Sequence, residues 1–169
     1  KRLATAQRGH KLLKDKRDEL MKGFLELARE NKVLREQVEE ALADVYGSFS
    51  IAGAVMSKEV MEEALMFPKQ GVTLTVGSKN VMSVDVPRFG FETTAQDASD
   101  IYPYGYASTS GELDSAIKEL ADIFPIMLEL AAKEKEAQML AAELERTRRR
   151  VNALEYVKIP QMEMTIRYI

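Results

Sequence analysis

Leucine recurs every seven residues near the start of the chain, and apolar residues follow several of these leucines at positions four residues on. The apolar positions of this pattern are Leu13, Leu20, Phe24, Leu27, Leu34, Val38 and Val45. Polar residues interrupt the pattern at His10, Arg17 and Asn31. A seam with a period of 3.5 residues needs a partner helix to cover it.

A second heptad pattern lies near the other end of the chain, at Leu140, Leu144, Val151 and Leu154. Two such segments in one chain predict a pair of long antiparallel helices. Because 3.5 residues is less than the natural period of the α-helix, the pair should form a left-handed coiled coil. The expected fold is therefore mainly α, a single elongated domain over residues 1–169 suited to reach and stiffness.

The first helix is expected to run from about residue 5 to about residue 66. Good helix formers dominate there, and the first proline is Pro68. Sixty residues in a helix would span roughly 90 Å. Small residues at 47–54 permit either a bend or a close approach of neighbouring backbone.

The period then changes from helical to alternating. Apolar and polar residues alternate at 72–76 and again at 82–86, with Gly77-Ser78-Lys79-Asn80 between them. This pattern predicts a β-hairpin over about 72–86, with its loop at 77–80 and Pro87 at its end. Residues 88–110 are expected to be irregular.

The second long helix is expected over about 111–169. Pro125 lies inside it and should kink it, because proline lacks a backbone donor and crowds the preceding turn. Apolar spacing continues beyond Pro160, so the helix should continue past that residue with another bend. The chain starts without Met and stops in mid-pattern, so we expect a trimmed chain or the ordered part of a longer protein.

Composition excludes several classes of site. The chain has 169 residues and no Cys, which excludes disulfides and thiolate metal sites. No apolar run reaches the length of a membrane span, and no signal-like segment is present. Any link to a membrane should therefore come through a partner.

The net charge of −3 conceals a strong asymmetry. Residues 1–35 hold eleven Lys/Arg and five Asp/Glu, and residues 146–169 hold six and two, whereas residues 36–145 hold seven and twenty. If the two termini lie together, one end of the rod is basic and the rest is acidic. Such blocks fit either a solvated helix surface or two different partners, one at each end.

Catalytic chemistry finds no support in the sequence. There is no phosphate-binding glycine loop, no nucleophile elbow and no outstanding carboxylate pair, and the single histidine, His10, has Lys14 rather than a second ligand four residues on. We therefore predict no catalytic residue, no cofactor and no metal site.

The run Arg148–Arg150 must point at least partly to solvent, to an acidic partner or to nucleic acid. Nucleic acid is weakly supported, because no aromatics are interleaved and the chain is acidic.

Three tyrosines, Tyr102, Tyr104 and Tyr106, cluster with Pro103 and Gly105. Clustered tyrosine with proline and glycine is an ordinary way to hold a loop in place. The same composition is also typical of an interface hot spot. Both interpretations stay open at this point.

Several stretches carry a family likeness. Residues 2–20 and 147–156, followed by Ile159-Pro160 and residues 165–169, closely resemble the N-terminal and C-terminal helices of the D subunit of the V-type/A-type rotary ATPases. Residues 80–84 with Pro87 resemble the central hairpin of the same family. The resemblance covers nearly the whole chain in the right order, and its spacing is closer to the prokaryotic members.

The resemblance implies a non-catalytic rotor shaft in the central stalk, peripheral on the cytoplasmic side of the membrane and without direct membrane insertion. The paired terminal helices would enter the hexamer of A and B subunits, the small F subunit would bind along the shaft, and the far end would sit on the C/d-type subunit that caps the membrane ring. Rotation would couple ATP synthesis or hydrolysis to proton or sodium translocation.

On this interpretation, basic residues at the terminal end are candidates for contact with the surrounding stator, namely Lys11, Lys14, Arg17, Arg146, Arg148, Arg149 and Arg150. The tyrosine cluster is the candidate for contact at the far end. The alternative is a prefoldin-like coiled-coil chaperone or scaffold, since such proteins also join two long helices through β-hairpins. Their tips expose apolar residues, whereas both ends of this chain are highly charged.

Overall fold

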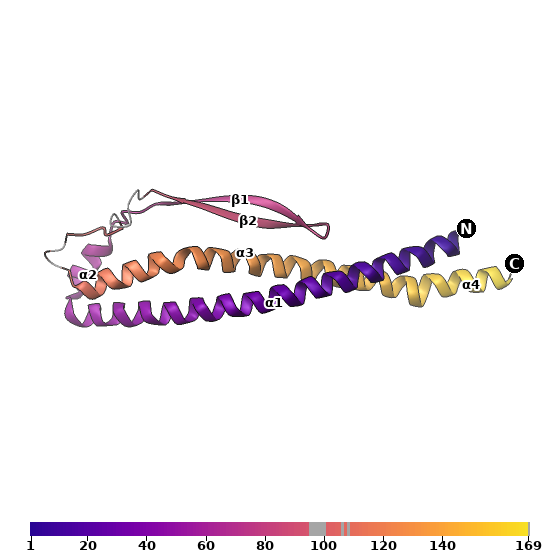
Figure 1. Cartoon of the computed structure of the whole chain (residues 1–169), viewed down its shortest axis with the longest axis horizontal. Helices are drawn as coiled ribbons and strands as arrows, with labels where there is room; N and C mark the ends of the chain where they lie inside the picture. Colours follow the sequence, from indigo (N-terminus) through magenta and orange to yellow (C-terminus); the bar gives the residue numbers. More distant parts are fainter. Residues whose placement is uncertain (95–100, 106, 108, 169) are drawn as a thin grey trace. The chain divides into compact units, whose positions relative to one another are not determined.

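The computed structural model describes residues 1–94, 101–105, 107 and 109–168. Its helices are α1 (Arg2–Val55), α2 (Lys58–Leu65), α3 (Gly111–Ala153), a π-helix at Leu154–Lys158 and α4 (Ile159–Tyr168), and its two strands are β1 (Val72–Val81) and β2 (Val84–Thr93) (Figure 1). The predicted fold class, mainly helical with an inserted β-hairpin, is confirmed. The predicted single domain over 1–169 stays a prediction. No helix in the described residues is long and apolar enough to cross a bilayer.

Two compact units divide the chain. Unit 1 contains Lys1–Glu30, Lys79–Val86 and Glu134–Ile169, and unit 2 contains Asn31–Ser78 and Pro87–Lys133. Each unit therefore takes one part of α1, one part of α3 and one part of the hairpin. The hairpin tip belongs to unit 1, and the rest of the hairpin belongs to unit 2.

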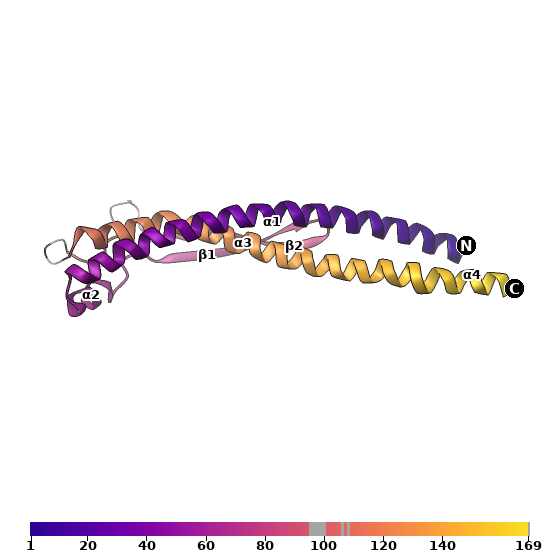
Figure 2. The ribbon, with the colours of Figure 1, turned by 90° about the horizontal axis from the view of Figure 1, so that it is seen from below.

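In unit 1, the first part of α1 lies beside the last part of α3 and α4, and both termini are at the same end (Figures 1 and 2). Leu20, Leu27 and Leu140 form its buried cluster. Two cross-helix contacts fix the antiparallel register, Lys16 Nζ to Glu143 Oε1 at 3.1 Å and His10 Nε2 to Glu155 Oε2 at 3.3 Å. As the residue number rises on one helix, it falls on the other.

In unit 2, the second part of α1 also pairs with α3 in antiparallel order. The hydroxyl of Ser48 donates to Glu119 Oε2 at 3.3 Å, and the side-chain amide of Asn31 donates to the backbone carbonyl of Lys133 at 3.3 Å. A second buried cluster closes the pair where α1 ends, and its members are Ala52, Ala64 and Leu113. The small residues predicted to allow close approach thus include one, Ala52, that packs directly under the start of α3.

The first helix does not run unbroken to residue 66 as the sequence predicted. It ends at Val55, and α2 begins at Lys58. The reason is local, because Ser57 adopts an extended conformation and its side chain caps α2 by accepting the backbone N–H of Val60 at 3.3 Å. A Ser N-cap satisfies a helix donor that would otherwise be unpaired, and it favours a new helix start over continuation.

The predicted position of the hairpin loop was wrong. The sequence placed it at 77–80, whereas those residues belong to β1 and the turn is Met82-Ser83, with φ of 52° and 68°. Positive φ at both central residues is the mark of the tight turn that matches strand twist. The side chain of Asn80 supports this turn, since its Oδ1 accepts the N–H of Ser83 at 3.2 Å. Strand β2 extends to Thr93, so the segment predicted as irregular begins later than residue 88.

The second long helix begins at Gly111, and α3 continues through Pro125. Before Pro160 the backbone changes to the π-helix, in which the N–H of Ile159 bonds to the carbonyl of Leu154. Proline cannot donate a backbone hydrogen bond, so a local change of bonding pattern just before it lets the helix continue as α4.

Candidate functional site

The predicted seam residues all lie at buried or half-buried positions. Leu20, Leu27, Val38, Val45, Leu140 and Val151 are buried, and Leu13, Phe24, Leu34, Leu144 and Leu154 are half-buried. Thr147 is a polar residue inside the seam and is only 1% exposed. The side chains facing outward from the helix pair are therefore the ones available to partners.

The predicted stator-contact residues gather on the terminal half of unit 1. Six of them are exposed, namely Lys11, Lys14, Arg146, Arg148, Arg149 and Arg150, while Arg17 is half-buried. The three positions directly before Val151 are thus consecutive exposed arginines on α3, as the sequence required. We call these seven residues the basic surface.

Part of the basic surface is already neutralised inside the chain. Arg17 donates to Asp18 Oδ1 at 2.7 Å, Arg149 donates to Glu145 Oε1 at 2.8 Å, and Arg146 lies 3.3 Å from Glu143 Oε2. Within the described residues, the other four members of the basic surface, Lys11, Lys14, Arg148 and Arg150, have no ion-pair partner. These four side chains are the strongest candidates for attraction to an acidic partner.

The tyrosine cluster proves to be partly structural. The hydroxyl of Tyr104 donates to Asp114 Oδ1 at 2.8 Å, and its ring packs against the buried cluster of unit 2. Tyr102 lies 6.1 Å from Tyr104 between ring centroids, and both rings are half-buried. Tyr106 lies outside the described residues. Tyr104 therefore anchors the loop, and Tyr102 keeps part of its surface available.

The sequence requires the apolar face of the hairpin to pack on the helices or on another chain, because a lone hairpin is marginal in water, but it does not say where the contact lies. Val81, Met82 and Val84 pack against the Leu20–Leu27–Leu140 cluster of unit 1. Gly23 lies opposite Met82, and a Cβ built at Gly23 would come within 3.0 Å of Met82 Cε. The available signals were a glycine inside a helical heptad and a methionine at a turn, neither of which is explained locally.

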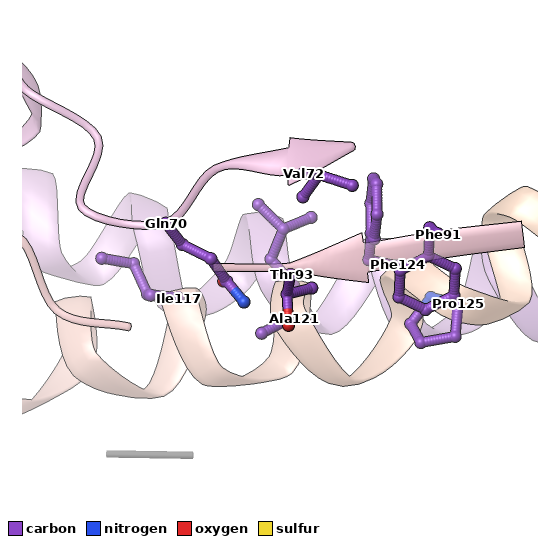
Figure 3. A pocket seen from close by; sticks show the side chains of 9 residues that line it. Gln70, Val72, Phe91, Thr93, Ile117, Ala121, Phe124 and Pro125 are labelled. Atoms are coloured by element: carbon purple, nitrogen blue, oxygen red, sulfur yellow. The ribbon is translucent and has the colours of Figure 1, made fainter. Parts of the chain in front are cut away.

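Unit 2 contains a cavity of about 230 Å³ between the base of the hairpin and α3 (Figure 3). Its walls are mainly apolar, and the rings of Phe91 and Phe124 meet edge to face at 5.8 Å beside it. Gln70 and Thr93 supply the polar side chains. A site for acid–base or nucleophilic chemistry needs convergent titratable groups, and this cavity has none. In the described part of the chain, no group of three or more His, Cys, Asp or Glu side chains could hold a metal ion.

Large apolar side chains are exposed in unit 2, near the end of α1 and just beyond α2. Tyr46 is 66% exposed, Val55 is 71% exposed and Phe67 is 75% exposed. Exposed apolar side chains thus accompany the charged residues in this part of the chain, and the sequence did not reveal them, because periodicity cannot tell which positions lack a covering element. These three side chains are therefore open to contact with a partner.

Comparison with known proteins identifies the family. The family model for the D subunit of ATP synthase matches residues 1–169. A V-type ATP synthase D subunit of Acetivibrio thermocellus is 63% identical over all of this chain and 76% of its own length. Proteins of the same name from Clostridioides difficile and a Thermoanaerobacter species are 60% and 53% identical over all of this chain, which spans 76% and 80% of their lengths. The chain therefore belongs to the family of ATP synthase D subunits.

Proposed function

We propose that this subunit of a V/A-type ATP synthase is its non-catalytic central rotor, which transmits torque between the A/B hexamer and the ion-translocating ring of the membrane. The observation that carries the proposal is the antiparallel helix pair of unit 1, which has an apolar seam inside and the basic surface outside. Membership of the D-subunit family supports the same role.

A torque shaft needs resistance to bending, and the seam supplies it. Leu20 and Leu140 are 0% and 2% exposed, and full burial of one such side chain contributes about 1.5–3 kcal/mol. Many such burials in series hold two helices together along their length. The ion pair from Lys16 to Glu143 also holds the two helices in register, since Glu143 is only 14% exposed.

A rotor must also turn inside its bearing. Interlocking apolar contacts would hold the shaft in one orientation, whereas exposed charges attract a partner over several ångströms without interdigitation. Lys11, Lys14, Arg148 and Arg150 have this character. We propose that the basic surface faces acidic loops or helices of the A and B subunits.

The remaining partners follow from the same assignment. The F subunit of the central stalk would bind along the shaft, and the C/d-type subunit that caps the membrane ring would receive the far end. The part-exposed Tyr102 and the exposed side chains of Tyr46, Val55 and Phe67 support a protein contact of unit 2. The complex would lie on the cytoplasmic side of the membrane.

The test is charge reversal on the basic surface. The triple variant Arg148→Glu, Arg149→Glu, Arg150→Glu should weaken assembly with a reconstituted A/B hexamer and lower the torque measured in single-molecule rotation. The assembly constant of the unmodified chain should fall as salt rises, because exposed charges are screened. Unchanged affinity and unchanged turnover of the triple variant at moderate salt would contradict the proposal.

A matched control reverses three exposed lysines of unit 2, Lys32→Glu, Lys58→Glu and Lys69→Glu. It changes the net charge by the same amount away from the basic surface, so assembly with the hexamer should be retained. An aggregation assay distinguishes the rotor from the prefoldin-like chaperone alternative. A rotor should not suppress aggregation of unrelated unfolded proteins, even though single apolar side chains are exposed in unit 2.

A further inference from the structure

We propose that the hairpin tip, residues 79–86, is a latch. The side chain of Met82 docks the tip on the helix pair of unit 1 at Gly23, and the tip can undock while the helix pair stays intact. The proposal rests on four observations within unit 1: the position of the tip, the backbone of the turn, the space at Gly23 and the packing around Met82.

The tip packs with the helices of unit 1, although its residues continue the two strands of the hairpin. Residues Lys79–Val86 fall in unit 1 by their contacts, while the rest of both strands falls in unit 2. Strand β1 is exposed at every position from Val72 to Asn80, so along that strand the first partly covered residue is Val81. The contacts that hold the tip are therefore concentrated at Val81, Met82 and the start of β2.

The first residue of the turn, Met82, is of a type that is rarely found in the backbone conformation it adopts. Met82 has a φ of 52°, a conformation that Gly, Asn and Asp adopt readily and that bulky side chains avoid. Met has no polar group that could stabilise the turn locally. A strained residue persists when its surroundings over-determine it, so the reason for Met82 must lie in what its side chain contacts.

The contact is a methionine resting in a space that a glycine leaves. A Cβ at Gly23 would lie 3.0 Å from Met82 Cε and 3.7 Å from Met82 Sδ. Around this point Leu20, Leu27 and Leu140 form the buried cluster against which Met82 packs. Glycine inside a helix lowers its stability, and at position 23 it leaves the terminal methyl group of Met82 room that a Cβ would take.

The turn itself is held independently of the docking. Asn80 donates to Asp85 Oδ1 at 2.7 Å and accepts the N–H of Ser83, and both bonds lie within the tip. The tip can therefore leave the helices as an intact turn. Undocking removes Val81, Met82 and Val84 from the outside of the Leu20–Leu27–Leu140 cluster, whose members still face one another. The tip also carries Val86, which is 1% exposed.

The function of the latch rests on the proposed rotor function. A docked tip makes the pair a three-element structure at the level of Gly23, which resists bending more than two helices do. An open latch leaves the helices alone. The latch would thus set the stiffness of the shaft at this point.

The experiment uses spin-label distances in the complete chain. The sequence has no Cys, so labels at Lys22→Cys and Lys79→Cys, two exposed positions of unit 1, mark only the helix and the tip. With Gly23 and Met82 intact, we expect one narrow distribution of short distances. Gly23→Leu should shift it to long, broad distances, whereas Gly47→Leu, at a helical glycine with nothing within 4 Å of a Cβ, should leave it unchanged.

A second variant protects the test against misfolding. Met82→Asn suits the positive φ and keeps the turn, yet it removes the side chain that docks. It should give the same long distances, with amide exchange at the tip about tenfold faster or more and with unchanged helical circular dichroism. Narrow short distances in both variants, or broad distances in the parent chain, would overturn the latch. None of these measurements needs an assembled complex, so they stand or fall separately from the rotor proposal.

Discussion

Asn31 occupies a heptad position in the middle of the α1 seam, between Leu27 and Leu34, and its amide is only half satisfied. Its NH2 group donates to the backbone carbonyl of Lys133 at 3.3 Å, while its buried Oδ1 has no partner among the described residues. The orientation of the amide is fixed, because the Lys133 carbonyl can only accept. We predict that Asn31→Leu stabilises the chain.

The magnitude follows from two opposing terms. Leaving a buried acceptor unpaired costs about 1–3 kcal/mol, and the hydrogen bond that is lost contributes about 0.5–1.5 kcal/mol. Asn31 is half-buried, so the net gain should be about 1 kcal/mol. For a chain of this size, that corresponds to a rise in Tm of about 2–4 °C.

The assay is urea unfolding followed by circular dichroism, with thermal melts as a second measure. The midpoint should rise with an unchanged slope, which identifies a change in stability. Asn152→Leu, at an exposed asparagine of α3, is the matched control and should change stability by less than about 0.5 kcal/mol. If Asn31→Leu lowers the midpoint, the amide forms stabilising bonds beyond the one to the Lys133 carbonyl, and the prediction is wrong. Sedimentation should also reveal some mispaired or associated species, because a buried Asn favours one register over others.

Three further variants test the packing. Leu20→Ala should lower the free energy of unfolding by about 2–5 kcal/mol in urea titrations, while Leu12→Ala, at a side chain that is 70% exposed, should change it little. Gly90→Ala should loosen the hairpin in amide-exchange measurements, because the new Cβ would lie 2.9 Å from Thr75 Oγ1; adding Thr75→Ala should restore protection, and failure to do so would disprove the clash. Ser57→Ala should destabilise α2 by about 0.5–2 kcal/mol through loss of its N-cap, seen as faster proteolysis at the junction, and an unchanged cleavage rate would show that the cap is dispensable.

Heptad periodicity was enough to find the pairing of the two chain ends. Leucine spacing is a local property that demands a covering partner, and the second heptad pattern of the same chain supplies it, so the seam could be read from the sequence. The end of the first helix could not be predicted from the sequence in this way. Ser57 looks like an ordinary helix residue until its side chain is seen to cap the next helix.

The turn of the hairpin was missed for a related reason. Gly77-Ser78-Lys79-Asn80 has better turn residues than Met82-Ser83, so local preference favours the wrong position. The structure pairs Asn80 with Asp85 across the strands, and the turn lies at Met82-Ser83, beyond the best local candidates at 77–80. Contact with the helices outweighs local preference at Met82, and no single-sequence pattern carries that information.

The sequence predicts that the basic surface is positively charged, but it does not predict which of its side chains are free of ion pairs within the chain. Three consecutive arginines on a helix cannot all face the partner helix, because the helix has 3.6 residues per turn, so at least one or two must point away from it. Which of them are already paired depends on rotamers and neighbours. Arg149 is paired to Glu145, whereas Arg148 and Arg150 are not paired within the described residues.

The antiparallel register has a consequence for the order of folding. The contact from Ser48 to Glu119 closes a loop of 71 residues, and the contact from His10 to Glu155 closes a loop of 145. Doubling the length of a flexible loop costs about 0.6 kcal/mol in closure entropy, so pairing should begin in unit 2 and proceed towards the termini. Pulse labelling during refolding should protect amides near Ala52 before those near Leu20, and the reverse order would contradict this sequence of events. During synthesis, the N-terminal half of α1 would then wait for almost the entire chain before it meets its partner.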